Sequence, residues 1–415
     1  MITTINNENK ELNFSSEREQ SQACLNSAEH EKNQGRKVLN VPNLRFPEFQ
    51  GEWEEERLAD IADLYKGTSI SKDQLSDDGE PCILYGELYT KYKSETIREV
   101  ISKTNIDNTK LVRSKANDVI IPCSGETAED IATARCVLNG NILLGGDLNI
   151  IRLHGYDGTF MSYQLNGKRK YDIAKVAQGV SVVHLYGEHL KGVKTINPCL
   201  TEQKKIASLL TLLDKRIATQ NKIIEDLKKL KYAISKKLLC NDKWTTYKIQ
   251  DIAEIGRGRV ISSIEIDRQK HPLYPVYSSQ TSNDGIMGYL DNYMFDGEYI
   301  TWTTDGANAG TVFYRKGKFN CTNVCGTLKI QPKFDCYFVS LVLQQATQKY
   351  VSSNLANPKL MNNTMASIKI RMPNIETQKQ LSKVFQALDG CLFIHQRTCE
   401  MYLKEKQYLL RQMFI

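Results

Sequence analysis

Residues 198–238 read PCLTEQKKIASLLTLLDKRIATQNKIIEDLKKLKYAISKKL, and this stretch decides the fold. Its apolar residues recur at alternating steps of four and three, which is the pattern of a helix that packs along one narrow seam. The seam consists of Ile206, Leu210, Leu213, Ile217, Ile224, Leu227, Ile234 and Leu238. A continuous helix from Thr201 to Leu239 would be about 58 Å long at about 1.5 Å per residue. The pattern therefore predicts a rod rather than a helix of a globular core.

The same seam occurs a second time, 175 residues further on. Pro198 and Pro373 precede the two stretches, and 373 − 198 = 175. At that offset the second seam consists of Leu381, Phe385, Leu388, Leu392, Cys399, Tyr402, Leu409 and Met413. Two matched seams are expected to bury each other in an antiparallel helix pair, because neither tolerates water. The alternative is that each helix packs only on its own domain.

Polar residues interrupt the two seams at the same places. They are Gln220 and Lys231 in the first seam and His395 and Lys406 in the second. We interpret all four as positions that set the register of the pair or extend to solvent. For the helix starts, Thr201 and the segment 377–380 predict N-terminal caps. The two spacer helices are assigned to residues 199–241 and 374–415.

Another repeated sequence segment marks the start of each of two domains. Residues 53–67, WEEERLADIADLYKG, match residues 244–258, WTTYKIQDIAEIGRG, and 244 − 53 = 191. Because the offset falls from 191 to 175, the second domain is shorter inside. Short β-like runs separated by turn residues follow in both halves. The sequence predicts an α/β (α+β) chain with two mixed α/β domains, residues 42–198 and 242–373, in a pseudo-twofold internal repeat with the helix pair.

The composition is that of a globular protein with a weak preference for an anionic partner. Of its 415 residues, 41% are hydrophobic, and 55 Lys and Arg against 48 Asp and Glu give a net charge of +7. Residues 1–41 are polar and are expected to form a flexible extension. No apolar run is long enough for a membrane span, so a cytoplasmic protein is expected. The eleven cysteines are scattered and predict reduced thiols; the pair Cys321 and Cys325 lacks partners for a zinc site.

With these features, the chain resembles the specificity subunits of type I restriction-modification systems. The resemblance spans residues 42–415. It rests on the opening segment 42–53 with residues 58–62, on residues 190–207 leading into 210–214, and on the repetition of both. Thr377-Gln378 in the second half stands where Glu202-Gln203 stands in the first, which is a departure from the repeated pattern.

The resemblance implies two target-recognition domains, each of which reads one half of a split DNA site. It implies that the helices set the spacing between them. It also implies partners: two modification subunits that methylate adenine with S-adenosylmethionine, and two restriction subunits that use ATP and Mg²⁺ to translocate and cleave DNA. On this interpretation the chain itself is not an enzyme and holds no cofactor or metal.

The sequence lacks the motifs expected of a stand-alone DNA methyltransferase or ATPase. A methyltransferase should carry a Gly-rich loop and an Asn-Pro-Pro-type segment, but Asn197-Pro198 and Asn357-Pro358 are followed by Cys and Lys. A phosphate-binding Gly-x-x-x-x-Gly-Lys-Ser/Thr loop is also absent. Two alternatives stay open: a specificity subunit of a modification-only methyltransferase assembly, and a coiled-coil scaffold that does not bind DNA.

Candidate DNA-binding residues were chosen from polar, turn-rich loops, because base edges are read by Arg, Lys, Asn and Gln while phosphates accept any basic or small polar group. In the first domain they are Lys91, Tyr92, Lys93, Ser124, Lys168, Arg169 and Lys170. In the second domain they are Arg257, Arg259, Gln280, Asn283, Thr303, Thr304 and Asn308. The serine, threonine and asparagine loops are equally compatible with structural turns.

Overall fold

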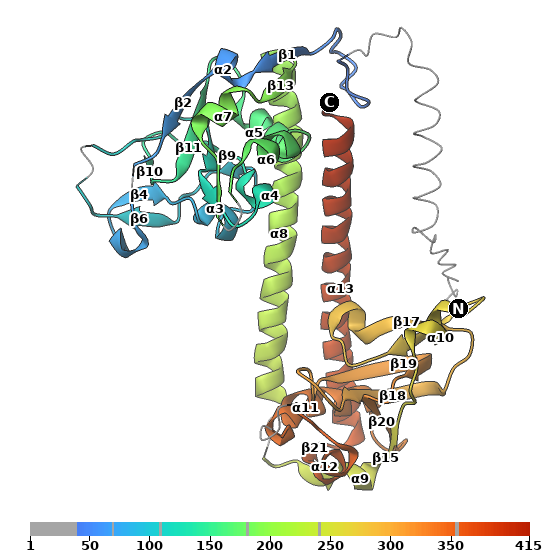
Figure 1. Ribbon diagram of the computed structural model, residues 1–415. Coiled ribbons are helices and arrows are strands. Elements are labelled where there is room, and N and C mark those ends of the chain that lie inside the picture. Colours follow the sequence, from blue (N-terminus) through green and yellow to red (C-terminus); the bar gives the residue numbers. More distant parts are fainter. Residues whose placement is uncertain (1–39, 69, 108–109, 180–181, 240–241, 353–356) are drawn as a thin grey trace. The chain divides into compact units, whose positions relative to one another are not determined.

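The computed structural model describes residues 40–415, apart from residues 69, 108–109, 180–181, 240–241 and 353–356. The predicted extension, residues 1–41, therefore lies almost wholly outside the described residues. The chain forms two compact units, Met1–Asp214 with Lys404–Ile415, and Lys215–Leu403. Each unit holds one mixed α/β domain and a part of both long helices (Figure 1), which confirms the predicted fold class. Among the described helices, none is long and apolar enough to cross a membrane.

The first unit is built on a five-stranded sheet in the order β2-β11-β7-β9-β5. A smaller sheet has the order β10-β4-β6-β3, and the pairs β1-β13 and β8-β12 complete the strands. The strands are β1 (Glu54–Arg57), β2 (Ala62–Lys66), β3 (Leu75–Ser76), β4 (Glu80–Ile83), β5 (Thr96–Ile97), β6 (Ser102–Thr104), β7 (Asp118–Pro122), β8 (Ser124–Gly125), β9 (Arg135–Val137), β10 (Leu143–Leu144), β11 (Leu148–Leu153), β12 (Val183–His184) and β13 (Lys194–Asn197). The helices are α2 (Leu58–Ile61), α3 (Glu87–Thr90), α4 (Ala128–Ile131), α5 (Gly158–Asn166), α6 (Lys170–Val176) and α7 (Gly187–Lys191), with the 3-10 turn η1 (Lys72–Gln74).

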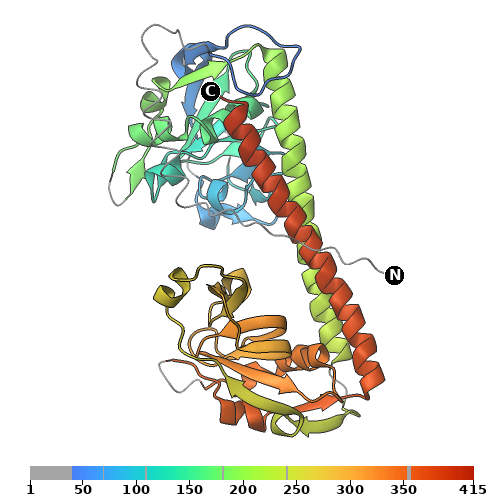
Figure 2. The ribbon, with the colours of Figure 1, turned by 90° about the vertical axis from the view of Figure 1, so that its right-hand side faces the viewer.

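The second unit is built on a six-stranded sheet in the order β15-β20-β18-β19-β16-β17, drawn in yellow to orange in Figure 2, with a separate pair β14-β21. Its strands are β14 (Thr245–Lys248), β15 (Ala253–Arg257), β16 (Tyr274–Tyr277), β17 (Ile286–Leu290), β18 (Phe295–Thr303), β19 (Val312–Cys321), β20 (Cys325–Ile330) and β21 (Lys369–Met372). Its helices are α9 (Ile249–Ile252), α10 (Ser263–Asp267), α11 (Cys336–Ala346) and α12 (Asn362–Ser367), with the 3-10 turns η2 (Ser282–Gly285) and η3 (Thr347–Tyr350).

The two domains share one sheet topology. The order β2-β11-β7-β9 in the first matches β15-β20-β18-β19 in the second, and neighbouring strands in both runs are antiparallel. The opening tryptophans have equivalent places as well. The rings of Trp53 and Phe160 lie 5.9 Å apart, as do those of Trp244 and Phe338. The repeat found in the sequence is therefore a repeat of structure, while the remaining strands pair differently: the first unit has a separate four-stranded sheet and the second extends one sheet to six strands.

Each long helix begins two residues after the repeated proline, and an equivalent glutamine binds each helix to its domain. The helices are α8 (Leu200–Leu238) and α13 (Ile375–Gln412). The amide Nε2 of Gln203 donates to the carbonyl of Pro198 (2.7 Å), and its Oε1 accepts from the backbone N–H of Asp157 (2.9 Å). Gln378 makes the equivalent pair of bonds, to Pro373 (2.8 Å) and from Asp335 (3.0 Å). These bonds fix the direction in which each helix leaves its domain.

The predicted helix caps are wrong. Thr201 lies inside the first turn of α8, and the cap of α13 is Asn374, whose Oδ1 accepts from the backbone N–H of Thr377 (2.9 Å). Gln203 and Gln378, which bind the domains, occupy the first turns of the two helices. The proline that precedes each helix limits its extension toward the N-terminus. A Thr-based cap is one of several ways to satisfy the free N–H groups of a helix start, so the residue type alone did not identify it.

Within each unit, α8 and α13 run antiparallel and side by side (Figures 1 and 2). Of the sixteen seam residues, fifteen are buried or half-buried: Ile206, Leu210, Leu213, Ile217, Ile224, Leu227, Ile234, Leu381, Phe385, Leu388, Leu392, Cys399, Tyr402, Leu409 and Met413. Leu238, at the end of the first seam, is 37% exposed. In the first unit Ile206 and Leu210 share a cluster with Leu409 and Met413. In the second, Phe385 is fully buried in a cluster that also contacts Leu381, Leu388 and Ile234.

The polar residues that interrupt the seams are paired with one another or with aspartates. Gln220 and His395 occupy equivalent positions in the repeat, because 395 − 220 = 175, and the Oε1 of Gln220 lies 2.7 Å from the Nδ1 of His395. Lys406 bonds to Asp214 in the first unit, and Lys231 bonds to Asp389 in the second. The interruptions therefore contribute register-specific contacts between the helices rather than solvated gaps.

Candidate nucleic-acid interface

The first domain carries a cavity of about 760 Å³ whose walls come from separate segments of the chain. Side chains from α3, β8, α4 and β9 and from the turn η1 meet there. Cationic, aromatic and hydrogen-bonding groups are mixed in the lining, which includes Lys72, Lys93, Arg135, Tyr85, Tyr89, Ser124, Glu126, Asp130 and Thr133. Cations can meet phosphates, aromatic rings can stack on bases, and carboxylates can accept from base amino groups. The cavity is therefore suited to a nucleic acid.

Contacts inside the cavity fix its aromatic wall. The hydroxyl of Tyr89 donates to the carbonyl of Ser124 (3.2 Å), and the ammonium of Lys93 donates to the carbonyl of Tyr89 (2.6 Å). Burial raises the pKa of the Tyr89 phenol well above its ordinary value, so this hydroxyl keeps its proton at alkaline pH values where an exposed phenol would ionise. The Ser124 hydroxyl lies 3.3 Å from the Nδ1 of His184, on the neighbouring strand β12. The wall is thus ordered before any ligand arrives.

The second domain carries an ordered loop next to strand β17. Asn283, Asp284 and Gly285 adopt three successive left-handed conformations, with φ of 48°, 56° and 83°. Arg315, which is 4% exposed, lies between the rings of Tyr277 (3.6 Å) and Phe313 (4.4 Å) and donates to the backbone carbonyl of Asp284 (2.7 Å). Residues held in sparsely populated conformations cluster at functional sites. The loop presents Ser282, Asn283 and Asp284 to solvent.

Of the predicted DNA-binding residues of the first domain, some are accessible at the surface or in the cavity, and others have structural partners. Lys93 and Ser124 line the cavity, and Lys168 is exposed while Lys170 is half-buried. The prediction is corrected for Tyr92, because its ring belongs to the core and its hydroxyl accepts from the backbone N–H of Ile101 (3.2 Å). Lys91 bonds to Glu87 and Ser102, and Arg169 bonds to Asp172 and to the carbonyl of Ile415, so both have structural partners.

The second domain requires a similar correction. Thr303 and Thr304 are both buried, and Thr304 bonds to the carbonyl of Val324, so neither side chain is available to a base. Gln280 and Asn308 hold the loop of residues 278–285 from inside, through the carbonyls of Ile286 and Ser279. Asn283 is exposed at the tip of that loop.

The two predicted DNA-binding arginines that follow the opening segment of the second domain, Arg257 and Arg259, are exposed but have protein partners. Arg257 donates to the carbonyl of Asn323 and to the hydroxyl of Thr304 (3.1 Å). Arg259 forms a two-pronged pair with Glu265, and this hydrogen bond raises the pKa of the guanidinium. Both would have to exchange these partners to contact DNA.

Sequence reasoning missed Lys72 and Arg135, which line the cavity from outside the chosen loops. No local pattern marks them, because η1 and β9 are distant in sequence from α3. A second cavity in the first unit, of about 470 Å³, is lined by Glu52, Glu54 and Glu56. Its carboxylates would repel phosphates, so this cavity is unsuited to DNA. Across the described residues, His, Cys, Asp and Glu form no group that could hold a metal ion.

Comparison with known proteins identifies the family. Residues 50–229 and 241–400 match the family described as the type I restriction modification DNA specificity domain. The chain belongs to that family. Its members are recognition subunits, which are not catalytic.

Individual relatives agree with this assignment. S.MpnORF201P of Mycoplasma pneumoniae, named as a type I specificity subunit, is 36% identical over 232 residues, which cover 52% of this chain and 93% of the relative. The type I restriction enzyme MpnII specificity subunit of the same organism is 39% identical over 178 residues, 42% of this chain and 53% of the relative. The crystal structure of a type I S subunit from M. genitalium has the same fold, with a TM-score of 0.67 at 18% identity, over 90% of this chain and 99% of that one.

Proposed function

We propose that this specificity subunit reads a bipartite DNA sequence, with each domain reading one half. The observation that carries the proposal is a duplicated frame with unlike reading surfaces. The sheet order, the tryptophan–phenylalanine contact and the glutamine hydrogen bonds repeat, whereas the residues that line the cavity of the first domain differ from those of the ordered loop in the second. Two domains with the same fold and different binding surfaces are suited to recognise two different DNA sequences for the same partner subunits.

The reading groups of the first domain are assigned to the cavity. Lys72, Lys93 and Arg135 supply the cations, and Tyr85 and Tyr89 supply the rings. In the second domain the exposed tip of residues 282–284 is assigned to base edges, because asparagine can make paired bonds to adenine. Lys168 and Lys170 are assigned to phosphates. The two domains are proposed to be independent in what they read.

Two modification subunits and two restriction subunits are proposed as partners, with S-adenosylmethionine, ATP and Mg²⁺ bound by those subunits. Both long helices carry large apolar side chains that are exposed outside the buried seam. In the second unit these include Leu230, Tyr232, Val384, Phe393, Ile394 and Met401. Exposed apolar patches of this kind mark protein–protein interfaces. This helix surface is proposed to dock the modification subunits.

Ile394→Glu should weaken binding of the modification subunit by about tenfold or more, because it places a charge in a desolvated interface. Ile394 is 62% exposed, so the fold should be unaffected. Co-purification of the tagged full chain with its modification subunit measures the effect. Gln396→Glu, which changes an exposed neutral residue two positions further along the same helix, is the charge-matched control. Equal retention of the partner by both variants would contradict this docking surface.

Module exchange tests the bipartite function directly. Replacing residues 244–370 with the corresponding segment of another specificity subunit should change one half of the methylated sequence and leave the other half unaltered. Methylome sequencing of a host that carries the gene, its exchanged version or neither measures both halves at once. A change in both halves would refute independent readers.

The same host distinguishes the second candidate, a modification-only assembly. Such an assembly would methylate DNA but would not restrict unmethylated phage DNA, and no restriction subunit would be encoded beside the gene. A scaffold that does not bind DNA would leave the methylome unchanged and would bind duplex DNA without the salt dependence of phosphate contacts.

A further inference from the structure

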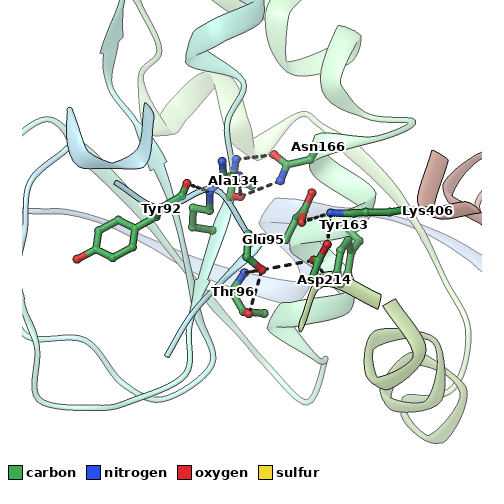
Figure 3. A network of polar contacts seen from close by, with 10 residues as sticks. Tyr92, Glu95, Thr96, Ala134, Tyr163, Asn166, Asp214 and Lys406 are labelled. Atoms are coloured by element: carbon green, nitrogen blue, oxygen red, sulfur yellow. Dashed lines mark hydrogen bonds and ion pairs between the residues drawn. The ribbon is translucent and has the colours of Figure 1, made fainter. Parts of the chain in front are cut away.

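A buried ionic cluster in the first unit joins three segments that are far apart in the sequence. The ammonium of Lys406, on α13, lies 2.7 Å from Oε2 of Glu95 and 2.7 Å from Oδ1 of Asp214, on α8 (Figure 3). The three side chains are 14%, 12% and 10% exposed, respectively. Glu95 belongs to the recognition domain and lies directly before β5. The cluster therefore ties a recognition-domain loop to both long helices at one point.

Further hydrogen bonds complete the cluster. The hydroxyl of Tyr163 donates to Asp214 (2.6 Å), and the hydroxyl of Ser94 donates to the same carboxylate (3.3 Å). Burial raises the pKa of Glu95, and Lys406 opposes this effect. Without the ammonium, two carboxylates would face each other out of water, which is strongly unfavourable. Lys406 is thus the group on which the arrangement of Ser94 and Glu95 depends.

The loop that ends at Glu95 carries part of the cavity wall. Tyr85, Tyr89 and Lys93 line the cavity, and Lys93 lies only two residues before Glu95. The base of the loop is held at successive residues. Arg135 donates from Nε to the carbonyl of Tyr92 (3.1 Å), and Ser94 bonds to Asp214. Glu95 bonds to Lys406 (Figure 3). A shift of Glu95 would therefore move Lys93, whose ammonium lines the cavity and donates to the carbonyl of Tyr89.

The internal repeat provides a comparison for this cluster. Lys231 is the equivalent of Lys406, because 406 − 231 = 175, and it pairs with Asp389, the equivalent of Asp214. Tyr337 donates to Asp389 (2.6 Å) as Tyr163 does to Asp214. Lys231 is more exposed, at 24%, and its described ion pair is with Asp389 alone, without a carboxylate of the recognition domain. The first unit thus adds Glu95 to a pair that both units share.

We propose that Lys406 is a positioning residue for DNA reading by the first domain, acting through Glu95 on the loop of residues 85–95. The inference rests on the proposed function. It means that sequence reading by the first domain depends on a residue of the last helix of the chain, and that the helix pair sets the shape of this reading surface as well as supporting it. The second domain has no such dependence on Lys231.

Lys406→Met tests this inference in the full chain assembled with its modification subunit. Methionine keeps the length and the apolar stem of lysine but removes the charge. Lys231→Met is the matched control, and Lys406→Arg, which retains the charge and several donors, is the rescue variant. Two quantities are measured: hydrogen exchange of residues 88–96, and the ratio of affinities for the methylome-defined duplex and for duplexes with one base changed in either half.

Lys406→Met should speed exchange of residues 88–96 and lower discrimination in the first half-site about tenfold, which is within the range of one lost base contact. Discrimination in the second half-site should be unchanged. Lys231→Met should leave exchange of residues 88–96 and first-half discrimination as in the wild type, and Lys406→Arg should recover most of both. Unchanged exchange in Lys406→Met would overturn the positioning role, and faster exchange with full discrimination would overturn its part in reading.

The controls separate this inference from the proposed function. If the wild-type assembly discriminated no duplex from any other, the bipartite function would fail, while the exchange data would still decide whether Lys406 holds the loop. A loss of discrimination in both halves, with equal effects of Lys406→Met and Lys231→Met, would indicate a general loss of stability and would overturn the specific role of Lys406.

Discussion

Gly326→Ala should destabilise the sheet of the second unit by about 3 kcal/mol, at the upper end of the usual cost of overpacking. Gly326 lies on β20 directly opposite Trp302 on β18, and an added Cβ would stand 2.2 Å from two atoms of the indole ring. Trp302 is fully buried, and its Nε1 donates to the carbonyl of Leu360 (2.9 Å), so the ring cannot turn away. Urea unfolding of the full chain, followed by hydrogen exchange of β18 and β20, measures the loss.

Gly390→Ala is the control, because the same change has the opposite expectation there. Gly390 is exposed in α13, and an added Cβ would meet no atom within 4 Å. Alanine in a helix interior should add about 0.5–1 kcal/mol of stability. Combining Gly326→Ala with Trp302→Phe should cost less than the sum of the single changes, since the smaller ring makes room. Additive costs would show that the indole is not the obstacle.

The helix pair could be predicted from sequence because the seam pattern depends only on residues close together in the chain, and because it occurs in two segments. A seam residue such as Phe385 is marked by its spacing from Leu381 and Leu388, and spacing survives without knowledge of the rest of the fold. The repeat then gave the antiparallel partner. Gln220 and His395, which looked like interruptions, contact each other because they are equivalent positions of an antiparallel repeat.

The reading surfaces could be predicted only in part, because exposure within a loop depends on distant segments. Tyr92 and Lys93 are adjacent in the sequence, yet the first is a core residue and the second lines the cavity. Thr303 looked like part of a polar turn but ends the buried strand β18. Arg135 had no motif around it and reaches the cavity because β9 lies beside β5 in the sheet. Periodicity describes which face a residue takes, not which segments converge.

One departure from the repeat, Glu202 against Thr377, has a structural explanation. The Glu202 side chain is fully buried in the first turn of α8 and accepts two hydrogen bonds from Arg45, at 2.8 and 2.7 Å. Arg45 also donates to the carbonyls of Gln50 and Gly51, and Leu44 donates to the carbonyl of Gln412 at the end of α13. This segment precedes the first domain only. Glu202 supplies the carboxylate that binds this segment through Arg45. Thr377 occupies the equivalent position in the second helix, where this segment does not pack.

Arg45→Met should therefore destabilise the first unit by about 3 kcal/mol, the lower end for a broken buried pair, because it leaves the carboxylate of Glu202 out of water without a partner. Calorimetry of the full chain and hydrogen exchange of residues 40–53 measure the effect. Arg57→Met is the control: Arg57 pairs with Asp60 at the surface, where both side chains are more than half exposed, and its loss should change little.

Arg45→Met combined with Glu202→Met separates charge from packing. If the cost of the single change comes from the stranded carboxylate, removing that carboxylate should recover more than half of the lost stability, because two apolar side chains of similar volume can replace a buried ion pair. If it comes from the lost bonds to Gln50 and Gly51, the double variant should be no better than Arg45→Met. The first result is expected, because the Glu202 side chain is fully buried while the two carbonyls belong to exposed residues.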